Sequence, residues 1–168
     1  YSFETIKKGL ESVAGVPGRF ELIPGTGDHT IIVDYAHTPD ALENVLKAIR
    51  EFAQGRIITV FGCGGDRDKT KRPIMGRIAG ELSDYCIITS DNPRTEDPIT
   101  IMNEIELGIK ETVCKYKMIE DRKDAIREAI DMSAPEDVVL IAGKGHETYQ
   151  ILGNKVIDFD DRKVAEEM

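Results

Sequence analysis

The sequence has 168 residues, of which 40% are hydrophobic and 32% are charged, and this balance is typical of one globular domain with a buried core. Acidic residues outnumber basic ones by 31 to 22, and the net charge of −9 makes nucleic acid and anionic membrane surfaces unfavourable partners. The sequence contains neither a long apolar run nor a signal-peptide pattern, so we expect a cytoplasmic location.

The first segment predicts a helix that leads into a linker. Ser2 is a suitable N-cap, and Gly15 and Pro17 end the helical pattern. Apolar residues recur between them at helical spacing: Phe3, Ile6, Leu10 and Val13. Because the chain starts with Tyr1 instead of Met while this helix is already under way, we expect a piece of a longer protein.

From residue 30 onward, short apolar runs alternate with amphipathic helical patterns. The runs are typical of buried strands and span residues 30–33, 56–61, 85–89, 117–119 and 138–142. The helical patterns span residues 39–53, 73–83, 98–113 and 122–132, and a last helix begins at residue 161. Residues 149–152 and 155–159 flank Gly153-Asn154 and predict a hairpin. The alternation predicts a Rossmann-like α/β fold, with a mostly parallel sheet, helices on both faces and a C-terminal antiparallel hairpin.

The unusual polar residues follow the carboxyl ends of the predicted strands. They form four loops, at residues 34–39, 62–69, 90–94 and 143–147. Ligands of open α/β sheets bind outside these strand ends, where loops converge and helix N-termini point at anions. We therefore expect the four loops to share one rim.

The glycine-rich loop after the second strand lacks the pattern of a nucleotide cradle. Arg67 stands where a dinucleotide fingerprint that begins with Gly62 and Gly64 needs its third glycine, and no GxxxxGK[ST] motif occurs. Three cysteines without a CxxC pair also give no zinc-site or disulfide pattern. The loop instead carries the main basic cluster, which favours contact with a carboxylate or phosphate and has a solvated turn as its alternative: Arg67, Lys69, Lys71 and Arg72.

Two other loops together predict a site for a zwitterion. Pro93 fixes the backbone between Asn92 and Arg94, so that Arg94 can grip a carboxylate with two parallel hydrogen bonds. Glu147 follows two glycines and offers a carboxylate to an ammonium group. For the loop that contains Asn92 and Arg94, the alternative is an ordinary Asx turn with an exposed arginine. His37, taken alone, is more typical of a structural histidine.

Five motifs in this order resemble the C-terminal part of Mur ligases and cover essentially the whole chain: VPGRFE, DYAHTPDAL, GCGGDRDKTKRP, SDNPRTEDP and AGKGHETYQ. The resemblance implies a three-domain enzyme in which one domain holds a UDP-sugar and a central domain carries the Walker loop and the magnesium ligands. The last domain binds the incoming amino acid. Residues 1–18 would then be the helix and linker from the central ATPase domain, and residues 19–168 the amino-acid-binding domain.

The same resemblance implies a reaction that uses ATP and Mg²⁺. The pattern DNPR marks family members that add meso-diaminopimelate to UDP-MurNAc-L-Ala-D-Glu through an acyl phosphate. It also implies substrate contacts for Arg67, Asp91, Asn92, Pro93, Arg94, Gly143 and Glu147. Positions near the ATP are matched by Arg19, Asp34 and His37. No general base and no metal ligand are assigned to this domain.

Charge complementarity agrees with diaminopimelate as the amino acid. Lysine lacks one of its carboxylates and would leave Arg94 unpaired, at a cost on the order of 3–5 kcal/mol. Three other readings stay open: a lysine-adding Mur ligase, a stand-alone module that binds amino acids or nucleotides, and a dinucleotide-dependent oxidoreductase. As a ligase domain it would act by positioning and only after closing onto its partner domain, with Gly15–Gly18 as the hinge candidate.

Overall fold

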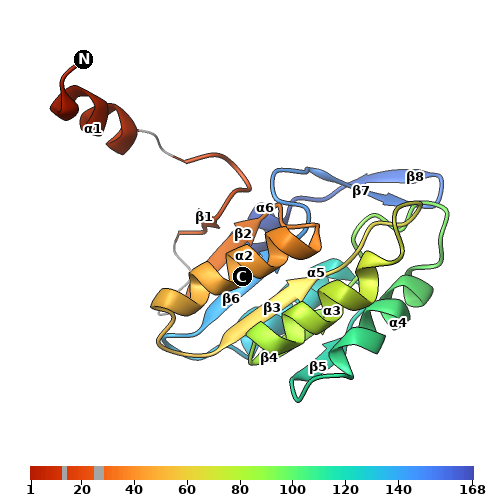
Figure 1. Cartoon of the computed structure of the whole chain (residues 1–168). Coiled ribbons are helices and arrows are strands. Elements are labelled where there is room, and N and C mark those ends of the chain that lie inside the picture. The colour runs from red at the N-terminus through yellow and green to blue at the C-terminus, as the bar shows by residue number, and fades with distance from the viewer. Residues whose placement is uncertain (13–14, 25–28) are drawn as a thin grey trace.

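The computed structural model describes residues 1–12, 15–24 and 29–168, and it shows a sheet of six strands between layers of helices (Figure 1). The strands of this sheet are β1 (Glu21–Leu22), β2 (Thr30–Asp34), β3 (Ile57–Phe61), β4 (Tyr85–Ile88), β5 (Lys115–Met118) and β6 (Val138–Ala142). A separate antiparallel hairpin consists of β7 (Tyr149–Leu152) and β8 (Lys155–Asp158). The helices are α1 (Phe3–Glu11), α2 (Pro39–Phe52), α3 (Lys71–Leu82), α4 (Pro98–Ile109), α5 (Arg122–Asp131) and α6 (Asp161–Glu166).

The strand order brings the chemically interesting loops together. The sheet has the order β1-β2-β6-β3-β4-β5, in which β1 is antiparallel to β2 and all other neighbours are parallel. Strand β6, although last in the sequence, therefore lies between β2 and β3. The carboxyl ends of β2, β6, β3 and β4 stand side by side, and the expected α/β fold with its C-terminal hairpin is confirmed.

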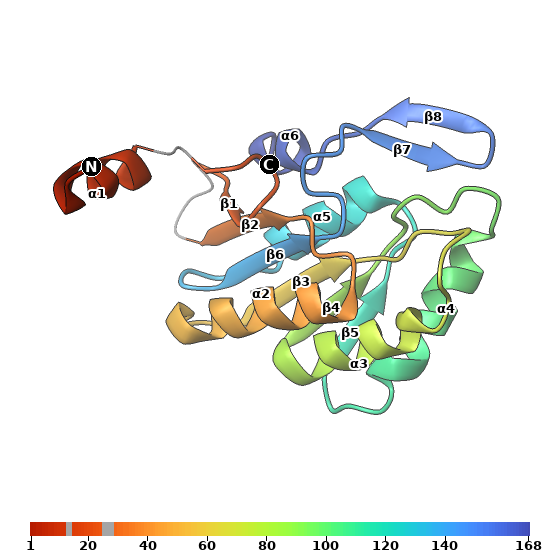
Figure 2. The same ribbon diagram turned by 45° about the horizontal axis from the view of Figure 1, so that its top comes forward.

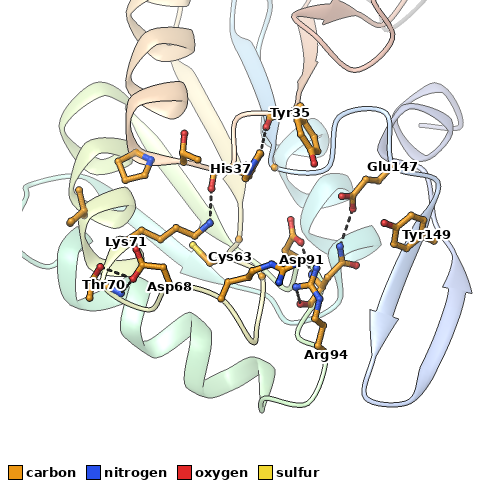
Figure 3. A pocket seen from close by; sticks show the side chains of 18 residues that line it. Tyr35, His37, Cys63, Asp68, Thr70, Lys71, Asp91, Arg94, Glu147 and Tyr149 are labelled. Carbon is orange, nitrogen blue, oxygen red and sulfur yellow. Dashed lines mark hydrogen bonds between the residues drawn. The ribbon is translucent and has the colours of Figure 1, made fainter.

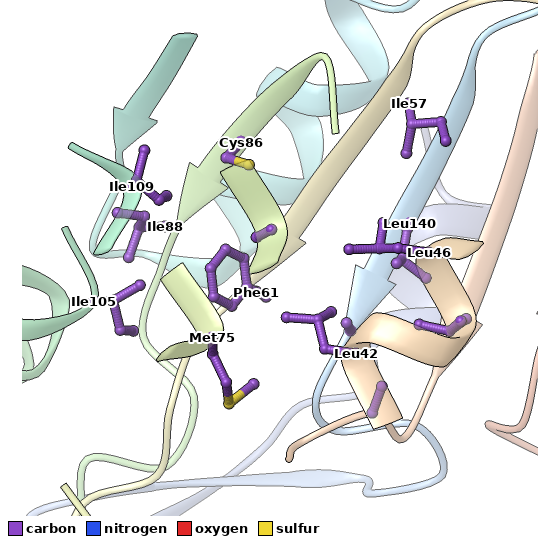
Figure 4. Close-up of a cluster of buried hydrophobic side chains, with 14 of the residues drawn as sticks. Leu42, Leu46, Ile57, Phe61, Met75, Cys86, Ile88, Ile105, Ile109 and Leu140 are labelled. Atoms are coloured by element: carbon purple, nitrogen blue, oxygen red, sulfur yellow. The ribbon is translucent and has the colours of Figure 1, made fainter. Parts of the chain in front are cut away.

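Two hydrophobic clusters cover the two faces of the sheet. Alternate residues of β3 divide between them, since Ile57 and Phe61 point to one face while Ile58 and Val60 point to the other. The first face is covered by α2, α3 and α4, whose buried side chains include Leu42, Met75 and Ile105 (Figure 4). The second is covered by α5 and α6 (Figure 2). Burial on both faces explains why β3 and β6 read as continuous apolar runs.

Three helix starts follow from local chemistry that is visible in the sequence. Thr38 and Asp97 cap α2 and α4 by accepting hydrogen bonds from the backbone amide three residues on, and a proline follows each cap. Asp121 caps α5 in the same way. These signals agree with the expected starts of α2, α4 and α5 to the residue.

Other boundaries differ from the sequence prediction. Helix α3 begins at Lys71, two residues before Pro73, and Arg72 in its first turn pairs with Glu96 and Glu104. Helix α4 ends at Ile109 instead of residue 113, and β1 was not predicted, because two residues with mixed burial leave no periodic pattern. Val13 lies outside the described residues. Among those that are described, no helix is long and apolar enough to cross a membrane.

Candidate functional site

A cavity of about 660 Å³ opens at the carboxyl ends of four adjacent strands (Figure 3). His37 follows β2, Arg67 follows β3, Asp91 follows β4 and Glu147 follows β6, and all four line it. The prediction that the four loops share one rim is therefore confirmed. Of the residues expected to contact the substrate or the nucleotide, those that line the cavity are His37, Arg67, Asp91, Asn92, Arg94, Gly143 and Glu147. Arg19, Asp34 and Pro93 lie outside its lining.

Only one of the three guanidinium nitrogens of Arg94 donates a hydrogen bond to a described residue. Its backbone has a φ of 54°, and its Nη1 donates to the carbonyl oxygens of Gly65 at 2.8 Å and Asn92 at 3.3 Å. Within the described part of the chain, Nε and Nη2 make no hydrogen bond. The guanidinium thus presents a fixed edge to the cavity, which suits a carboxylate bound through two parallel hydrogen bonds.

Arg67 approaches the same part of the cavity from another loop. A Cβ atom placed on Gly64 would lie 2.9 Å from Nη1 of Arg94 and 3.8 Å from Cγ of Arg67, so the two arginines flank this glycine. Arg67 is exposed and forms neither a hydrogen bond nor an ion pair with the residues described. A side chain at position 64 would therefore require the end of the Arg94 side chain to shift.

Two other basic residues of this loop, Arg72 and Lys69, form ion pairs within the domain. Arg72 is completely buried and pairs with Glu96 and Glu104 at 2.9 and 2.7 Å, so the predicted ligand contact is wrong for this residue. Hydrogen bonds from Arg72, the Asp66 amide and Lys69 lower the pKa of Glu96 to about 2. Lys69 also forms an ion pair with Glu96, with 3.0 Å between Nζ and Oε2. This network ties the loop after β3 to the loop after β4.

The acidic side of the cavity is formed by Asp91 and Glu147. Oδ1 of Asp91 accepts a hydrogen bond from the Asn92 amide at 2.6 Å, and Oδ2 lies close to Gly143, where a Cβ atom would stand 2.9 Å from it. Oε2 of Glu147 accepts from Nδ2 of Asn92 at 2.9 Å. Both carboxylates therefore line the cavity, Asp91 from the loop after β4 and Glu147 from the loop after β6 (Figure 3).

Sequence reasoning missed Lys144, whose side chain is fully buried behind the cavity wall. Its Nζ lies 2.9 Å from Oε2 of Glu147 and 3.2 Å from Oδ1 of Asn92. A lysine between two glycines is not by itself a burial signal, because lysine is almost always exposed. Only the folded loop reveals this contact.

The three residues expected near a nucleotide are partly occupied by contacts within the domain. Asp34 accepts hydrogen bonds from the amides of Phe20 at 2.7 Å and Ala36 at 2.8 Å, one at each carboxylate oxygen. The Arg19 guanidinium lies 4.6 Å above the centre of the Tyr35 ring, and the His37 ring lies 4.5 Å from the same ring. Tyr35 and His37 also line the cavity.

Neither a nucleophile nor a metal centre stands out among the described residues. Cys63 lines the cavity, but burial raises the pKa of its thiol to about 12, so it stays protonated near neutral pH. The described segments contain no group of three or more histidine, cysteine, aspartate or glutamate side chains arranged to hold a metal ion. The arrangement is suited to binding and orienting a charged ligand.

Known proteins resemble this chain over nearly its whole length. The Mur ligase glutamate ligase domain family matches residues 18–145. The UDP-N-acetylmuramoyl-L-alanyl-D-glutamate 2,6-diaminopimelate ligase of Alkaliphilus metalliredigens is 58% identical over 99% of this chain and 34% of its own length. The ligase of the same name from Clostridioides difficile is 58% identical over 96% of this chain and 33% of its own. The chain thus spans about a third of the length of these relatives.

Solved structures agree with the sequence comparison. A structure of a UDP-N-acetylmuramoyl-L-alanyl-D-glutamate 2,6-diaminopimelate ligase superimposes with a TM-score of 0.83 at 39% identity, covering 99% of this chain and 35% of that one. A Yersinia pestis folylpolyglutamate synthase/dihydrofolate synthase shares the fold, with a TM-score of 0.66 at 23% identity over 86% of this chain and 32% of its own. By sequence and by fold, the chain belongs to the Mur ligase glutamate ligase domain family.

Proposed function

We propose that this chain is the amino-acid-binding domain of an ATP-dependent ligase that adds meso-diaminopimelate to UDP-MurNAc-L-Ala-D-Glu in the cytoplasm. The observation that carries the proposal is the convergence of Arg67 and Arg94 with Asp91 and Glu147 on one cavity. A ligand with a carboxylate and an ammonium group at each end matches this set of charges. Relatives that bear the name of this ligase support the choice of substrate.

In this proposal the domain contributes binding and orientation. The open edge of Arg94 takes a carboxylate of the amino acid, with Arg67 as the second cation, while Asp91 and Glu147 receive an ammonium group. The amino group at the other end is then presented to the activated carboxyl group of the UDP-linked dipeptide. Holding two reactants in this way is worth about 7–11 kcal/mol of the barrier. ATP supplies the activation by forming an acyl phosphate on that carboxyl group.

We propose that nucleotide and metal are held mainly outside this chain. The described residues offer no cluster of metal ligands, and Asp34 already accepts two backbone hydrogen bonds. Arg19 and His37 remain the groups that approach the nucleotide after closure. Residues 1–18 act as the helix and linker from the ATPase domain, and residues 19–168 form the amino-acid-binding domain.

Of the hinge candidate Gly15–Gly18, we propose that only the residues before Gly18 rotate. This glycine has a φ of 68°, and a Cβ atom on it would collide with the backbone of Gly145 and His146. Gly15 has a φ of 90°, and no atom of the described residues lies within 4 Å of its Cβ position. Rotation is therefore expected around Gly15–Pro17, with Gly18 fixed to the domain.

The proposal is tested with a chimaera in which this chain replaces the matching third of the A. metalliredigens relative. We expect ATP-dependent ligation of meso-diaminopimelate with kcat/KM at least about a hundredfold above that for L-lysine, because lysine leaves one guanidinium unpaired. Phosphate release and the ligated product are measured together. A folded chimaera that prefers lysine, or that ligates neither amino acid while the parent enzyme is active, would refute the proposal.

A further inference from the structure

Lys144 is a buried cation that lies beside the ligand cavity without lining it. Its side chain has no exposed surface, and its ammonium group lies near three side chains, namely Glu147 at 2.9 Å, Asn92 at 3.2 Å and the Tyr149 ring at 5.5 Å from the ring centre. A lysine is almost never fully buried unless its charge is paired. The burial of Lys144 therefore depends on its pairing with Glu147.

The backbone of the loop explains how Lys144 and Glu147 come to face each other. Gly143 and Gly145 have φ angles of 116° and 50°, which residues other than glycine rarely adopt. The two glycines reverse the chain around Lys144, and the Glu147 amide donates to the Lys144 carbonyl oxygen at 2.9 Å. The Lys144 side chain is thus buried, whereas Glu147 lines the cavity.

Lys144 also fixes the orientation of the Asn92 amide. Oδ1 of Asn92 accepts hydrogen bonds from Lys144 and from the Ile151 amide, at 3.2 and 2.9 Å. The Nδ2 group must therefore point the other way, where it donates to Oε2 of Glu147 at 2.9 Å. Lysine, asparagine and glutamate form a closed triangle of hydrogen bonds.

The triangle leaves one oxygen of Glu147 available. Oε2 accepts from both Lys144 and Asn92, whereas Oε1 accepts no hydrogen bond within the described residues. With Lys144 removed, a single donor would hold Oε2, and the terminal torsion of glutamate, which is broad by nature, would be much less restrained. The charge of Glu147 would also lose its closest counter-charge.

We propose that Lys144 is a positioning residue that aims Oε1 of Glu147 at an ammonium group of the amino-acid substrate. The inference rests on the proposed function and deepens it. It assigns to Lys144 the selectivity of the cavity for a ligand whose bound end carries an ammonium group as well as a carboxylate. Lys144 itself stays behind the wall and does not touch the substrate.

The test compares meso-diaminopimelate with 2-aminopimelate in the chimaera described above. The analogue keeps one amino-acid end and the far carboxylate, but it lacks the far ammonium group. In Lys144→Met we expect KM for diaminopimelate to rise about tenfold or more with kcat nearly unchanged, the size of one lost hydrogen bond to a charged group. KM for 2-aminopimelate should change by less than about twofold, because no ammonium group is there to be recognised.

A double-mutant cycle separates positioning from general loosening of the loop. If Lys144 acts through Glu147, the double variant Lys144→Met/Glu147→Gln should match Glu147→Gln alone within about twofold in KM. This comparison also serves if Lys144→Met by itself fails to fold, because the double variant removes both charges. Lys117→Met is the matched control, since Lys117 forms a surface pair with Glu128 at 2.6 Å and should leave both KM values unchanged.

The outcomes distinguish a failure of the role proposed for Lys144 from a failure of the proposed ligase function. Equal rises in KM for both amino acids, a fall in kcat alone, or a further loss in the double variant would overturn the role of Lys144. If the unmutated chimaera ligates diaminopimelate but does not prefer it over 2-aminopimelate, the ammonium contact fails while the ligase function stands. If it ligates no diaminopimelate at all, the proposed function fails, and this inference with it.

Discussion

Charged residues in and around the cavity fall into two groups according to whether a partner inside the domain already satisfies them. Arg72 is buried between Glu96 and Glu104, and Arg122 forms a fully buried pair with Asp161 at 2.8 Å. Arg67 and Arg94, by contrast, keep donors that no described residue uses. Because a guanidinium with unused donors at a cavity is available to an anion, we propose that the second group recognises the ligand.

The clamp predicts a selective effect of Arg94→Ala in the chimaera. We expect kcat/KM for meso-diaminopimelate to fall about a hundredfold or more, because the carboxylate loses its paired hydrogen bonds in a partly buried site. KM for ATP should change by less than about threefold, since Arg94 faces the amino acid. Initial rates at varied concentrations of each substrate measure both values.

Arg50→Ala provides the control for this substitution. Arg50 is half exposed and donates to Leu82 and Asp84 away from the cavity, so its loss should leave both kinetic values unchanged. Equal damage to ATP and diaminopimelate use by Arg94→Ala would contradict a clamp for the amino acid.

Glu96 predicts an acid-dependent loss of stability. Its pKa is about 2 in the folded chain against an ordinary value of 4.5, so its contribution is present above about pH 4.5 and disappears as the pH falls towards 2. Glu96→Gln should therefore lower the free energy of unfolding near neutral pH by on the order of 2–3 kcal/mol. The difference between variant and parent should shrink below about pH 4.5. Urea unfolding followed by circular dichroism at several pH values tests this, and a difference independent of pH would rule it out.

At the scale of elements, α3 and α4 pack more closely than side chains usually permit. A Cβ atom on Gly76 would collide with the Ile105 carbonyl oxygen, and one on Gly108 with the Pro73 carbonyl oxygen. The two helices therefore meet backbone to backbone at these glycines. The loops after β3 and β4, which carry Arg67 and Arg94, lead into these helices, so this contact helps to fix the distance between the two arginines.

This contact predicts that Gly108→Ala destabilises the chain despite the better helix propensity of alanine. Propensity alone favours alanine by about 1 kcal/mol, whereas overpacking of a rigid contact costs about 1–3 kcal/mol or more. We expect a net loss of stability in thermal unfolding. Gly9→Ala in α1 is the control, because none of the described residues lies within 4 Å of that Cβ position and no loss is expected there. An unchanged or raised melting temperature for Gly108→Ala would contradict the close contact.

The sequence predicted the elements well where local signals are strong and less well where tertiary contacts decide. Capping residues and prolines give the starts of α2, α4 and α5, and Gly153-Asn154 gives the hairpin. The insertion of β6 between β2 and β3 is a tertiary arrangement that the pattern of alternation does not specify. Strand β1 exists only through its pairing with β2, so its two residues carry no pattern of their own.

The site shows the same division. The sequence predicted that the loops and their charged residues meet at one edge of the sheet, because the carboxyl ends of parallel strands lie together there. The partners of individual charges were not, since Arg72 and Arg67 belong to the same basic cluster yet one is buried and the other open. Lys144 is the clearest case, because its burial depends on the positive φ angles of the two glycines beside it.

At the scale of the whole molecule, α1 stands apart from the sheet and its helices (Figure 1). None of its residues is buried, and its apolar residues Phe3, Ile6 and Leu10 are 78%, 52% and 70% exposed. Deleting residues 1–12 should therefore leave the melting temperature of the remaining chain within about 2 °C, because no core contact is lost. Calorimetry of both chains measures this, and a large fall would show that α1 supports the domain.

The borders of the sheet have a consequence for handling the domain by itself. At one border only Glu21 and Leu22 extend beyond β2, and at the other Lys115 and Lys117 of β5 are exposed. An open border is a template on which a foreign strand can grow, and short strands and lysines discourage that growth. Both borders of the sheet therefore oppose pairing with a strand of a second molecule.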